Sequence, residues 1–271
     1  MNGLDRIAAV FSKTKNEGRA ALMPYFTLGF PNKQASLEVV ESLAAAGADL
    51  IELGVPFSDP LADGPTIQHS TQVALENGAN LSDCLKMVKD LRGRGIKQPL
   101  LLMGYYNPIL AFGPEYFVSE ACTAGADGLI VPDLPLEEAA IIETACRKHR
   151  LALVYLVAPT TPDERLALVA SHSTGFVYIV SLTGVTGARQ TVAAGLDDFI
   201  RRVRAATDKP VAVGFGISTP EQASRIGKLS DGVIVGSALV DAAEKAEDPS
   251  SAAGDFLHRL RLGLEKQPEQ M

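Results

Sequence analysis

The feature that most constrains the fold of this chain is a short apolar run that recurs eight times. Each run is rich in Val, Ile and Leu and is followed by a loop containing Gly, Pro or Asp, then by an amphipathic helical pattern. Nearly continuous apolar runs are typical of parallel strands that are covered on both faces. We therefore expect strands at 21–28, 49–55, 100–105, 128–131, 152–157, 176–181, 211–215 and 232–235.

Helical patterns alternate with these strands, at 33–46, 64–94, 114–124, 136–149, 162–171, 195–206, 220–227 and 238–264. Strict alternation predicts parallel pairing with right-handed crossovers, and eight such units in roughly 250 residues are the size of a (β/α)8 barrel. An open doubly wound sheet is the alternative, but it usually has a GxGxxG turn after its first strand, and the sequence there is TLGFP (27–31). We predict an α/β chain that forms a single (β/α)8 TIM barrel domain over residues 1–271. An extra N-terminal helix at 3–16 would close the bottom of the barrel, and 265–271 would be a polar tail.

Composition limits the kinds of partner that the chain can have. A net charge of −7, with no local block of Lys or Arg, argues against a nucleic acid or a membrane surface. The longest apolar stretches run to about 8 residues, whereas a membrane span needs roughly 20. Residues 1–19 carry charges throughout and lack a signal-peptide core, so we expect a cytoplasmic location. Cys84, Cys122 and Cys146 form no CxxC pattern and have no His at ligand spacing, so we expect buried thiols and no metal site.

Two carboxylates stand in the segment 52–65, ELGVPFSDPLADGP, at the end of the second expected strand. A carboxylate inside a buried strand is costly unless it is paired or protonated, and the loop that follows cannot continue the strand. We therefore interpret Glu52 as an acid/base and Asp63 as an orienting anion, both placed around one small substrate. The alternative is structural: a salt-bridged Glu52, and an Asp63 that caps the helix expected from 64.

Two glycine motifs follow the last two strands, GFGIS at 214–218 and GS at 236–237. Small residues let backbone N–H groups approach an anion, and the final helix begins at the second motif, so both motifs favour phosphate. The alternative is that the glycines only allow tight turns. The segment 182–196, rich in Gly and Thr, is long for a strand-to-helix loop, and we expect a lid there that closes over the substrate, or else a merely disordered loop.

These motifs together resemble the tryptophan synthase alpha chain family. The resemblance covers nearly the whole chain and rests on the segment 52–65, on TLGFP (27–31), on DGLIVPDLP (127–135), on GVTG (184–187) and on the two glycine motifs. It implies cleavage of indole-3-glycerol phosphate to indole and glyceraldehyde 3-phosphate, by a lyase of tryptophan biosynthesis.

The resemblance also implies roles for individual residues. Glu52 would be the general acid/base, Asp63 would hold the indole N–H, and Tyr178 would support the proton transfers. The substrate-binding set would be Tyr25, Thr186, Gly187, Phe215, Gly216, Gly236 and Ser237. The family usually has Phe at the position of Tyr25, so this chain adds a hydroxyl to an apolar pocket.

A partner is implied as well. The chain would dock on a tryptophan synthase β subunit in an αββα heterotetramer, with Asp59, Asn107, Pro108 and Asp133 on the contact surface. No cofactor is expected in this chain, since pyridoxal phosphate would belong to the β subunit. The alternatives are a free-standing lyase with the same residues, a non-catalytic activator of the β subunit, and another phosphosugar barrel enzyme. Many enzymes of the last kind have Lys or Asp at the end of strand 1, where this chain has Tyr25 and Thr27.

Overall fold

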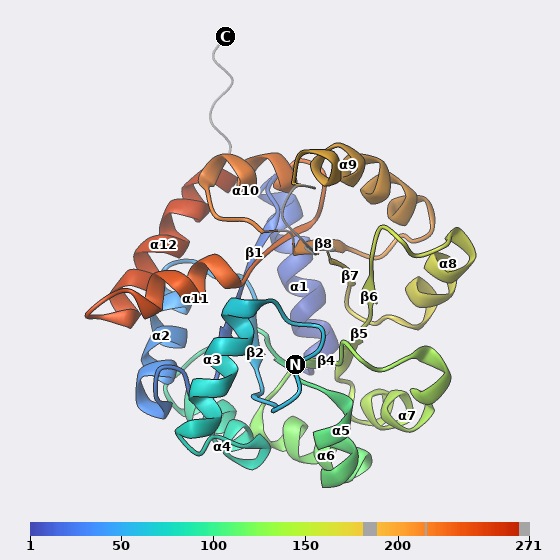
Figure 1. Cartoon of the computed structure of the whole chain (residues 1–271). Coiled ribbons are helices and arrows are strands. Elements are labelled where there is room, and N and C mark those ends of the chain that lie inside the picture. The colour runs from blue at the N-terminus through green and yellow to red at the C-terminus, as the bar shows by residue number, and fades with distance from the viewer. Residues whose placement is uncertain (181–188, 215, 266–271) are drawn as a thin grey trace.

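The strands form one closed parallel barrel (Figure 1). The computed structural model describes residues 1–180, 189–214 and 216–265, and its strand order is β5-β4-β3-β2-β1-β9-β8-β7-β6. β5 (Ala152–Val154) and β6 (Leu156–Val157) are two pieces of one strand separated by Tyr155, so the two ends of this order meet. The Tyr155 carbonyl accepts the N–H of Tyr178 at 3.1 Å and continues the ladder across the break. The predicted (β/α)8 barrel is confirmed.

The element bounds follow the predicted alternation. The other strands are β1 (Ala21–Thr27), β2 (Ile51–Gly54), β3 (Leu100–Met103), β4 (Gly128–Ile130), β7 (Val177–Val180), β8 (Val211–Gly214) and β9 (Gly232–Val235). The helices are α1 (Gly3–Asn16), α2 (Lys33–Ala45), α3 (Pro65–Glu76), α4 (Leu81–Gly93), α5 (Tyr106–Phe112), α6 (Pro114–Ala124), the 3-10 turn η1 (Leu136–Glu138), α7 (Ala140–His149), α8 (Asp163–His172), α9 (Arg189–Ala205), α10 (Pro220–Gly227), α11 (Ser237–Glu244) and α12 (Pro249–Leu264).

Four helix predictions were wrong in detail. The stretch 64–94 is two helices, because Gly78 adopts φ +71° and Asn80 caps α4 with its side chain. The stretch 238–264 is also two helices, with Asp248 and Pro249 starting α12. Helix α5 was not expected at all. Helix α9 begins at residue 189 rather than 195, so the part of the expected loop 182–196 from 189 onward is helical, and 182–188 lie outside the described residues.

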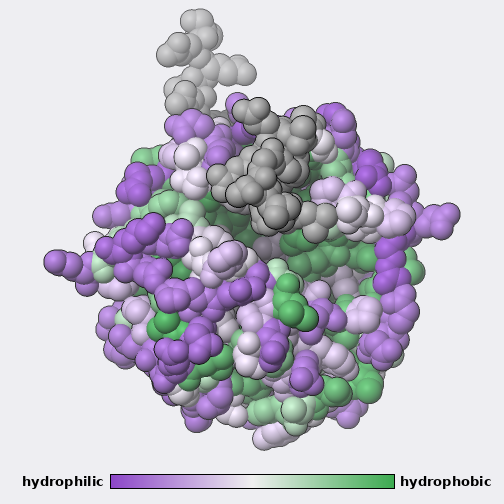
Figure 2. Space-filling model, in the orientation of Figure 1, coloured by the Kyte–Doolittle hydropathy of each residue, from purple (hydrophilic) through white to green (hydrophobic). Residues whose placement is uncertain are grey.

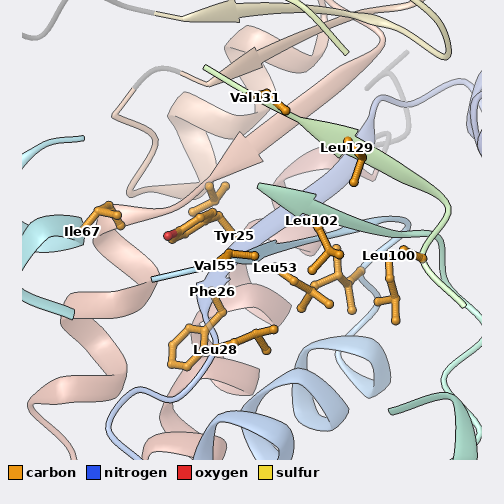
Figure 3. Close-up of a cluster of buried hydrophobic side chains, with 14 of the residues drawn as sticks. Tyr25, Phe26, Leu28, Leu53, Val55, Ile67, Leu100, Leu102, Leu129 and Val131 are labelled. Atoms are coloured by element: carbon orange, nitrogen blue, oxygen red, sulfur yellow. The ribbon is translucent and has the colours of Figure 1, made fainter. Parts of the chain in front are cut away.

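Two apolar layers hold the barrel together. The outer layer lies between the sheet and the helices, and Figure 3 shows part of it, with Phe26, Leu53, Leu102 and Leu129 projecting from β1, β2, β3 and β4. The inner layer fills the barrel with aliphatic and aromatic side chains and includes Ile7 and Phe11 of α1. Alternate residues of a strand face opposite sides, so β-branched and leucine-rich runs supply both layers.

Helix α1 closes the bottom of the barrel, as predicted. Its Phe11 ring packs against Phe176, which precedes β7, with 5.6 Å between centroids. Its Leu4 N–H donates to the carbonyl of Arg150, just before β5, at 3.2 Å. Both contacts are to residues at the amino ends of strands, so the opposite end of the barrel is the open one.

Three aspartates bind neighbouring strands together at the same bottom end. Each precedes a strand and accepts the N–H of a residue near the start of the preceding strand: Asp49 from Leu22 (2.9 Å), Asp127 from Leu100 (2.9 Å) and Asp231 from Val211 (2.8 Å). Each also pairs with an arginine, in the same order Arg19, Arg92 and Arg204. These contacts satisfy strand N–H groups where the ladders begin and stabilise the end of the barrel away from the carboxyl ends of the strands.

Candidate active site

Glu52 lies inside the barrel on β2, next to Tyr25 of β1 and Leu101 of β3 in the sheet register. Its side chain has no exposed surface, and neither carboxyl oxygen has a hydrogen-bond partner among the described residues. Burial without a partner raises the pKa of Glu52 from its ordinary 4.5 to about 8. The salt-bridged alternative for Glu52 is therefore not what the structure shows. At neutral pH the carboxyl carries a proton that it can donate and take back.

Asp63 lies on the loop between β2 and α3, where burial raises its pKa to about 6. The Tyr105 hydroxyl counters part of this shift by donating a hydrogen bond to the carboxylate, and it accepts the N–H of Ala62 at 2.9 Å. The capping alternative for Asp63 is wrong, because Gly64 is the N-cap residue of α3. Above pH 6 Asp63 is mostly ionised, as we expected for it, although it is more buried than its polar loop suggested.

Tyr105 is a residue of this cluster to which the sequence assigned no role. It follows β3, is buried, and packs its ring against Phe57 with 5.4 Å between centroids. Its position after a strand was visible in the sequence, but its pairing with Asp63 depends on how the β2–α3 loop folds back over β3.

Tyr25 and Tyr178 face the same two carboxyl groups. The charges of Glu52 and Asp63 help to raise the pKa of both phenols, after burial as the larger cause. Each phenol lies over a glycine at the end of the next strand. A Cβ on Gly54 would be 2.1 Å from the Tyr25 hydroxyl, and one on Gly214 would be 2.7 Å from the Tyr178 hydroxyl. These two glycines are needed because a tyrosine occupies the space of their side chains.

The carboxyl ends of β8 and β9 present the glycine motifs. Gly216 adopts φ +47°, so the turn itself requires glycine there, as the tight-turn alternative supposed. Gly236 is the N-cap residue of α11 and has no side chain with which to cap its first turn, and Ser237 is exposed beside it. The first turn of α11 thus has no side-chain cap, and an uncapped helix start suits an anion. Thr186, Gly187 and Phe215 lie outside the described residues.

The four expected contact residues lie on loops and on a helix end at the same open end of the barrel. Asp59, Asn107 and Asp133 are exposed and Pro108 is partly exposed. Asn107 and Pro108 belong to the first turn of α5 rather than to a loop, and the Asp133 carboxylate accepts the N–H of Tyr106, where α5 begins, at 2.8 Å. Figure 2 shows this face hollowed at its centre, with apolar residues in the hollow and hydrophilic residues around it.

The remaining candidate groups lie away from the carboxyl cluster. Cys84 and Cys146 are buried, which raises their thiol pKa values to about 12, and Cys122 is partly buried. Within residues 1–180, 189–214 and 216–265, no three His, Cys, Asp or Glu side chains are grouped to hold a metal. In the same part of the chain no helix is both long and apolar enough to cross a bilayer.

A closed (β/α)8 barrel with a protonated buried carboxyl, an ionised partner carboxylate and an uncapped helix start belongs to the class of barrel enzymes that perform acid–base chemistry on small phosphorylated substrates. The sequence profile of one such family, "Tryptophan synthase alpha chain", matches residues 11–266. The chain therefore belongs to the tryptophan synthase alpha chain family. It is a lyase of tryptophan biosynthesis, and its reaction is the cleavage of indole-3-glycerol phosphate into indole and glyceraldehyde 3-phosphate.

Individual relatives agree with this assignment. The chain is 54% identical to a tryptophan synthase alpha chain of Chloroflexus aggregans over 251 residues, which are 93% of this chain and 94% of the relative. It is 50% identical to that of a Roseiflexus species over 260 residues, 95% of this chain and 100% of the relative. Among solved structures, a tryptophan synthase alpha chain from Legionella pneumophila superposes with a TM-score of 0.90 at 36% identity, covering 100% of both chains. A chain of Mycobacterium tuberculosis tryptophan synthase gives 0.89 at 39% identity, covering 97% of this chain and 99% of the other.

Proposed function

We propose that Glu52 is the general acid/base of the lyase reaction and that Asp63 is its electrostatic partner. The observation that carries this assignment is the buried, unpartnered Glu52 carboxyl, whose pKa of about 8 keeps it protonated near neutral pH. A group with a pKa close to the working pH is the most effective proton shuttle, because both of its forms are accessible.

The reaction needs two proton movements and no electron acceptor. Protonated Glu52 donates to C3 of the indole ring, and the ring becomes a cation at its nitrogen. The carboxylate then takes the proton from the side-chain hydroxyl nearest the ring. The electron pair of that O–H bond forms the aldehyde C=O, the C–C bond to the ring breaks, and its electron pair restores the aromatic indole. Glu52 ends protonated, as it began.

Asp63 supports the first step. As an anion it accepts a hydrogen bond from the indole N–H and stabilises the positive charge that develops on the ring nitrogen. The Tyr105 hydroxyl holds the Asp63 carboxylate by a donated hydrogen bond. Tyr178 lies close enough to both carboxyl groups for their charges to raise its pKa, and we assign it a supporting role in the proton transfers.

The substrate phosphate would bind at the start of α11, to the N–H groups after Gly236 and to the Ser237 hydroxyl, with Gly216 opposite. Tyr25 would line the indole pocket. Thr186, Gly187 and Phe215 are proposed to complete this set on the strength of the family resemblance alone. Since the C–C bond breaks with no chemical help beyond proton transfers and charge stabilisation by side chains, we propose that the chain works without a cofactor.

Steady-state kinetics of Glu52→Gln and Asp63→Asn test these roles. Glu52→Gln should reduce kcat by at least about 100-fold while binding of the substrate changes little, since general acid–base groups supply roughly 10²–10⁴-fold. Asp63→Asn should reduce kcat nearly as much and also weaken binding of the indole moiety. More than about a tenth of wild-type kcat in Glu52→Gln would exclude the acid/base assignment.

We also propose that the open face docks on a tryptophan synthase β subunit, which holds pyridoxal phosphate, in an αββα heterotetramer. Large apolar side chains are exposed near the expected contact residues: Leu61, on the loop of Asp59, is 93% exposed, and Leu110, in α5 with Asn107 and Pro108, is 53% exposed. Exposed apolar groups beside a site commonly mark an interface. We further propose that residues 1–271 are a single domain with a polar tail at 265–271, and that the protein is cytoplasmic.

Indole release measured for the chain alone and with a β subunit tests the partner. A rise of an order of magnitude or more on adding the β subunit supports an alpha subunit under partner control. High activity that the β subunit leaves unchanged indicates a free-standing lyase. If no indole is released from indole-3-glycerol phosphate in either case, while the chain still raises the activity of the β subunit on supplied indole, the chain is a non-catalytic activator.

A further inference from the structure

We propose that a buried chain of three hydroxyls, Tyr25–Thr27–Ser70, positions helix α3 and with it the Asp63 carboxylate, so that Thr27 and Ser70 are positioning residues of the lyase reaction. The proposal rests on the role proposed above for Asp63. It concerns two residues that contact neither carboxyl group in the structure and that the sequence did not single out for a role in the site.

The hydroxyl chain connects the barrel to the helix that follows the Asp63 loop. The Tyr25 hydroxyl lies 3.2 Å from Thr27 Oγ1, and Thr27 Oγ1 lies 2.7 Å from Ser70 Oγ on α3. Ser70 Oγ donates in turn to the carbonyl of Ile67, at 2.9 Å. Tyr25 is only 7% exposed, and Thr27 and Ser70 are fully buried, so water does not compete for these bonds.

The Ile67 carbonyl sets the direction of the chain. A carbonyl only accepts, so the Ser70 proton points to it, Ser70 Oγ accepts from Thr27, and Thr27 Oγ1 accepts from Tyr25. Every hydroxyl then donates once, and all but Tyr25 also accept within the chain. The Tyr25 oxygen accepts no hydrogen bond within this chain of hydroxyls, and the Asp63 charge is the largest charge acting on this phenol. Figure 3 shows the Tyr25 hydroxyl directed toward Ile67.

Helix α3 begins without a side-chain cap, so a contact at its next turn helps to fix its position. Its N-cap residue is Gly64, which has no capping side chain, and its first residue is Pro65, which suits the first helical position. Asp63 precedes these two residues directly. Gln68 holds the Asp63 carbonyl with its side-chain amide at 2.9 Å, and Thr27 holds the next turn through Ser70. A shift of this turn therefore moves Asp63.

Tyr25, at the barrel end of the hydroxyl chain, is held by its neighbours. The Tyr25 hydroxyl occupies the space of a side chain at Gly54, and its Cβ and ring lie 3.6–3.8 Å from where a Cβ on Gly236 would be. The tyrosine thus lies between the ends of β2 and β9, and its burial limits the rotamers open to it. One end of the hydroxyl chain is on the rigid barrel and the other is on the helix next to Asp63.

The test compares Thr27→Val and Ser70→Ala with the wild type. Each should lower kcat/KM by about 3- to 10-fold, the effect of losing one good hydrogen bond from the positioning of a reacting group. The double variant should have a kcat/KM no lower than that of the less active single variant, because both substitutions remove the same hydrogen bond. Tyr25→Phe removes only the terminal bond and should have a smaller effect in the same direction.

The pH profile separates positioning from simple loss of stability. Tyr25, Tyr105 and Tyr178 lie near enough to Asp63 for its charge to act on them, and burial raises the pKa of Asp63 to about 6. When α3 is released, Asp63 gains water, so the acid limb of kcat/KM should move to lower pH. Thr14→Val is the matched control: Thr14 is also buried, and its hydroxyl bonds the Phe11 carbonyl at 3.2 Å at the far end of the barrel.

Each outcome decides the matter. If Thr27→Val and Ser70→Ala shift the acid limb and Thr14→Val does not, the proposal is supported. If Thr27→Val lowers only the thermal midpoint, as Thr14→Val does, and leaves the pH profile of kcat/KM unchanged, the hydroxyl chain is merely structural and the proposal fails. If Asp63→Asn itself keeps more than a tenth of wild-type kcat/KM, the role of Asp63 fails first. Should Thr27→Val not fold, Ser70→Ala, a helix-favouring change, gives the same readouts.

Discussion

Replacing Glu52 by Gln should stabilise the folded protein at neutral pH while it abolishes activity. The pKa of the carboxyl is about 8 in the folded chain and 4.5 as its ordinary value. Between these values the folded state keeps a proton that the unfolded chain releases, so the free energy of unfolding falls as pH rises, by about 1.4 kcal/mol per pH unit. At pH 7.5 the loss amounts to about 4 kcal/mol, and it levels off above pH 8.

A glutamine at this position is neutral at every pH and nearly the same shape. The variant should therefore match the wild type at pH 4.5–5 and exceed its free energy of unfolding by up to about 4 kcal/mol at pH 7.5. Urea unfolding of both proteins at pH 5, 6, 7 and 8, with the same extrapolation, measures this difference. Glu76→Gln makes the same chemical change at an exposed position of α3 and is the matched control.

The pattern across pH decides the outcome. A difference that grows with pH and stops growing near 8 supports a carboxyl that is kept protonated by burial. A difference that is the same at every pH would refute the reasoning, because Glu52 would then be ionised in the folded protein, with water or a partner that stabilises its charge.

Four further predictions follow from the same geometry. The profile of kcat/KM should be bell-shaped, falling below about pH 6 as Asp63 takes up a proton and above about pH 8 as Glu52 loses one, and a flat profile from 5 to 9 would contradict both roles. Gly214→Ala should fold but reduce kcat by about 10-fold or more, because the new Cβ would lie only 2.7 Å from the present position of the Tyr178 hydroxyl and would displace it. An unchanged kcat would remove Tyr178 from the chemistry. Ser237→Asp should raise KM by about 10-fold with little change in kcat and should abolish inhibition by inorganic phosphate, because the new carboxylate repels the phosphate group. Its charge should slightly stabilise the start of α11. An unchanged KM would place the phosphate elsewhere. Asp127→Asn should lower the free energy of unfolding by roughly 3 kcal/mol and leave kcat unchanged, because it leaves the partly buried Arg92 without its buried carboxylate partner at the end of the barrel away from the site.

Which residues reach the site was largely predictable from the chain. A strand that carries Glu52, a loop that carries Asp63 and two glycine motifs after the last strands are local patterns. Parallel strands in a barrel bring all their carboxyl ends to one rim, whatever their separation in sequence. The breaks within 64–94 and 238–264 were also written locally, in Asn77–Asn80 and in Asp248–Pro249, although the helical period hid them.

The local patterns of the sequence determined the eight strands, their alternation with helices and the strand ends on which the candidate site stands. Only the tertiary structure decided what each of those groups meets. The Tyr105 bond to Asp63 and the bond between Thr27 and Ser70 join residues 40 or more positions apart in sequence. The burial of Glu52, which leaves it without a partner among the described residues, comes from its place between two neighbouring strands. The physical reason is that period and propensity act over a few residues along the chain. The pKa of a buried carboxyl is set instead by atoms that sheet register and helix packing bring around it.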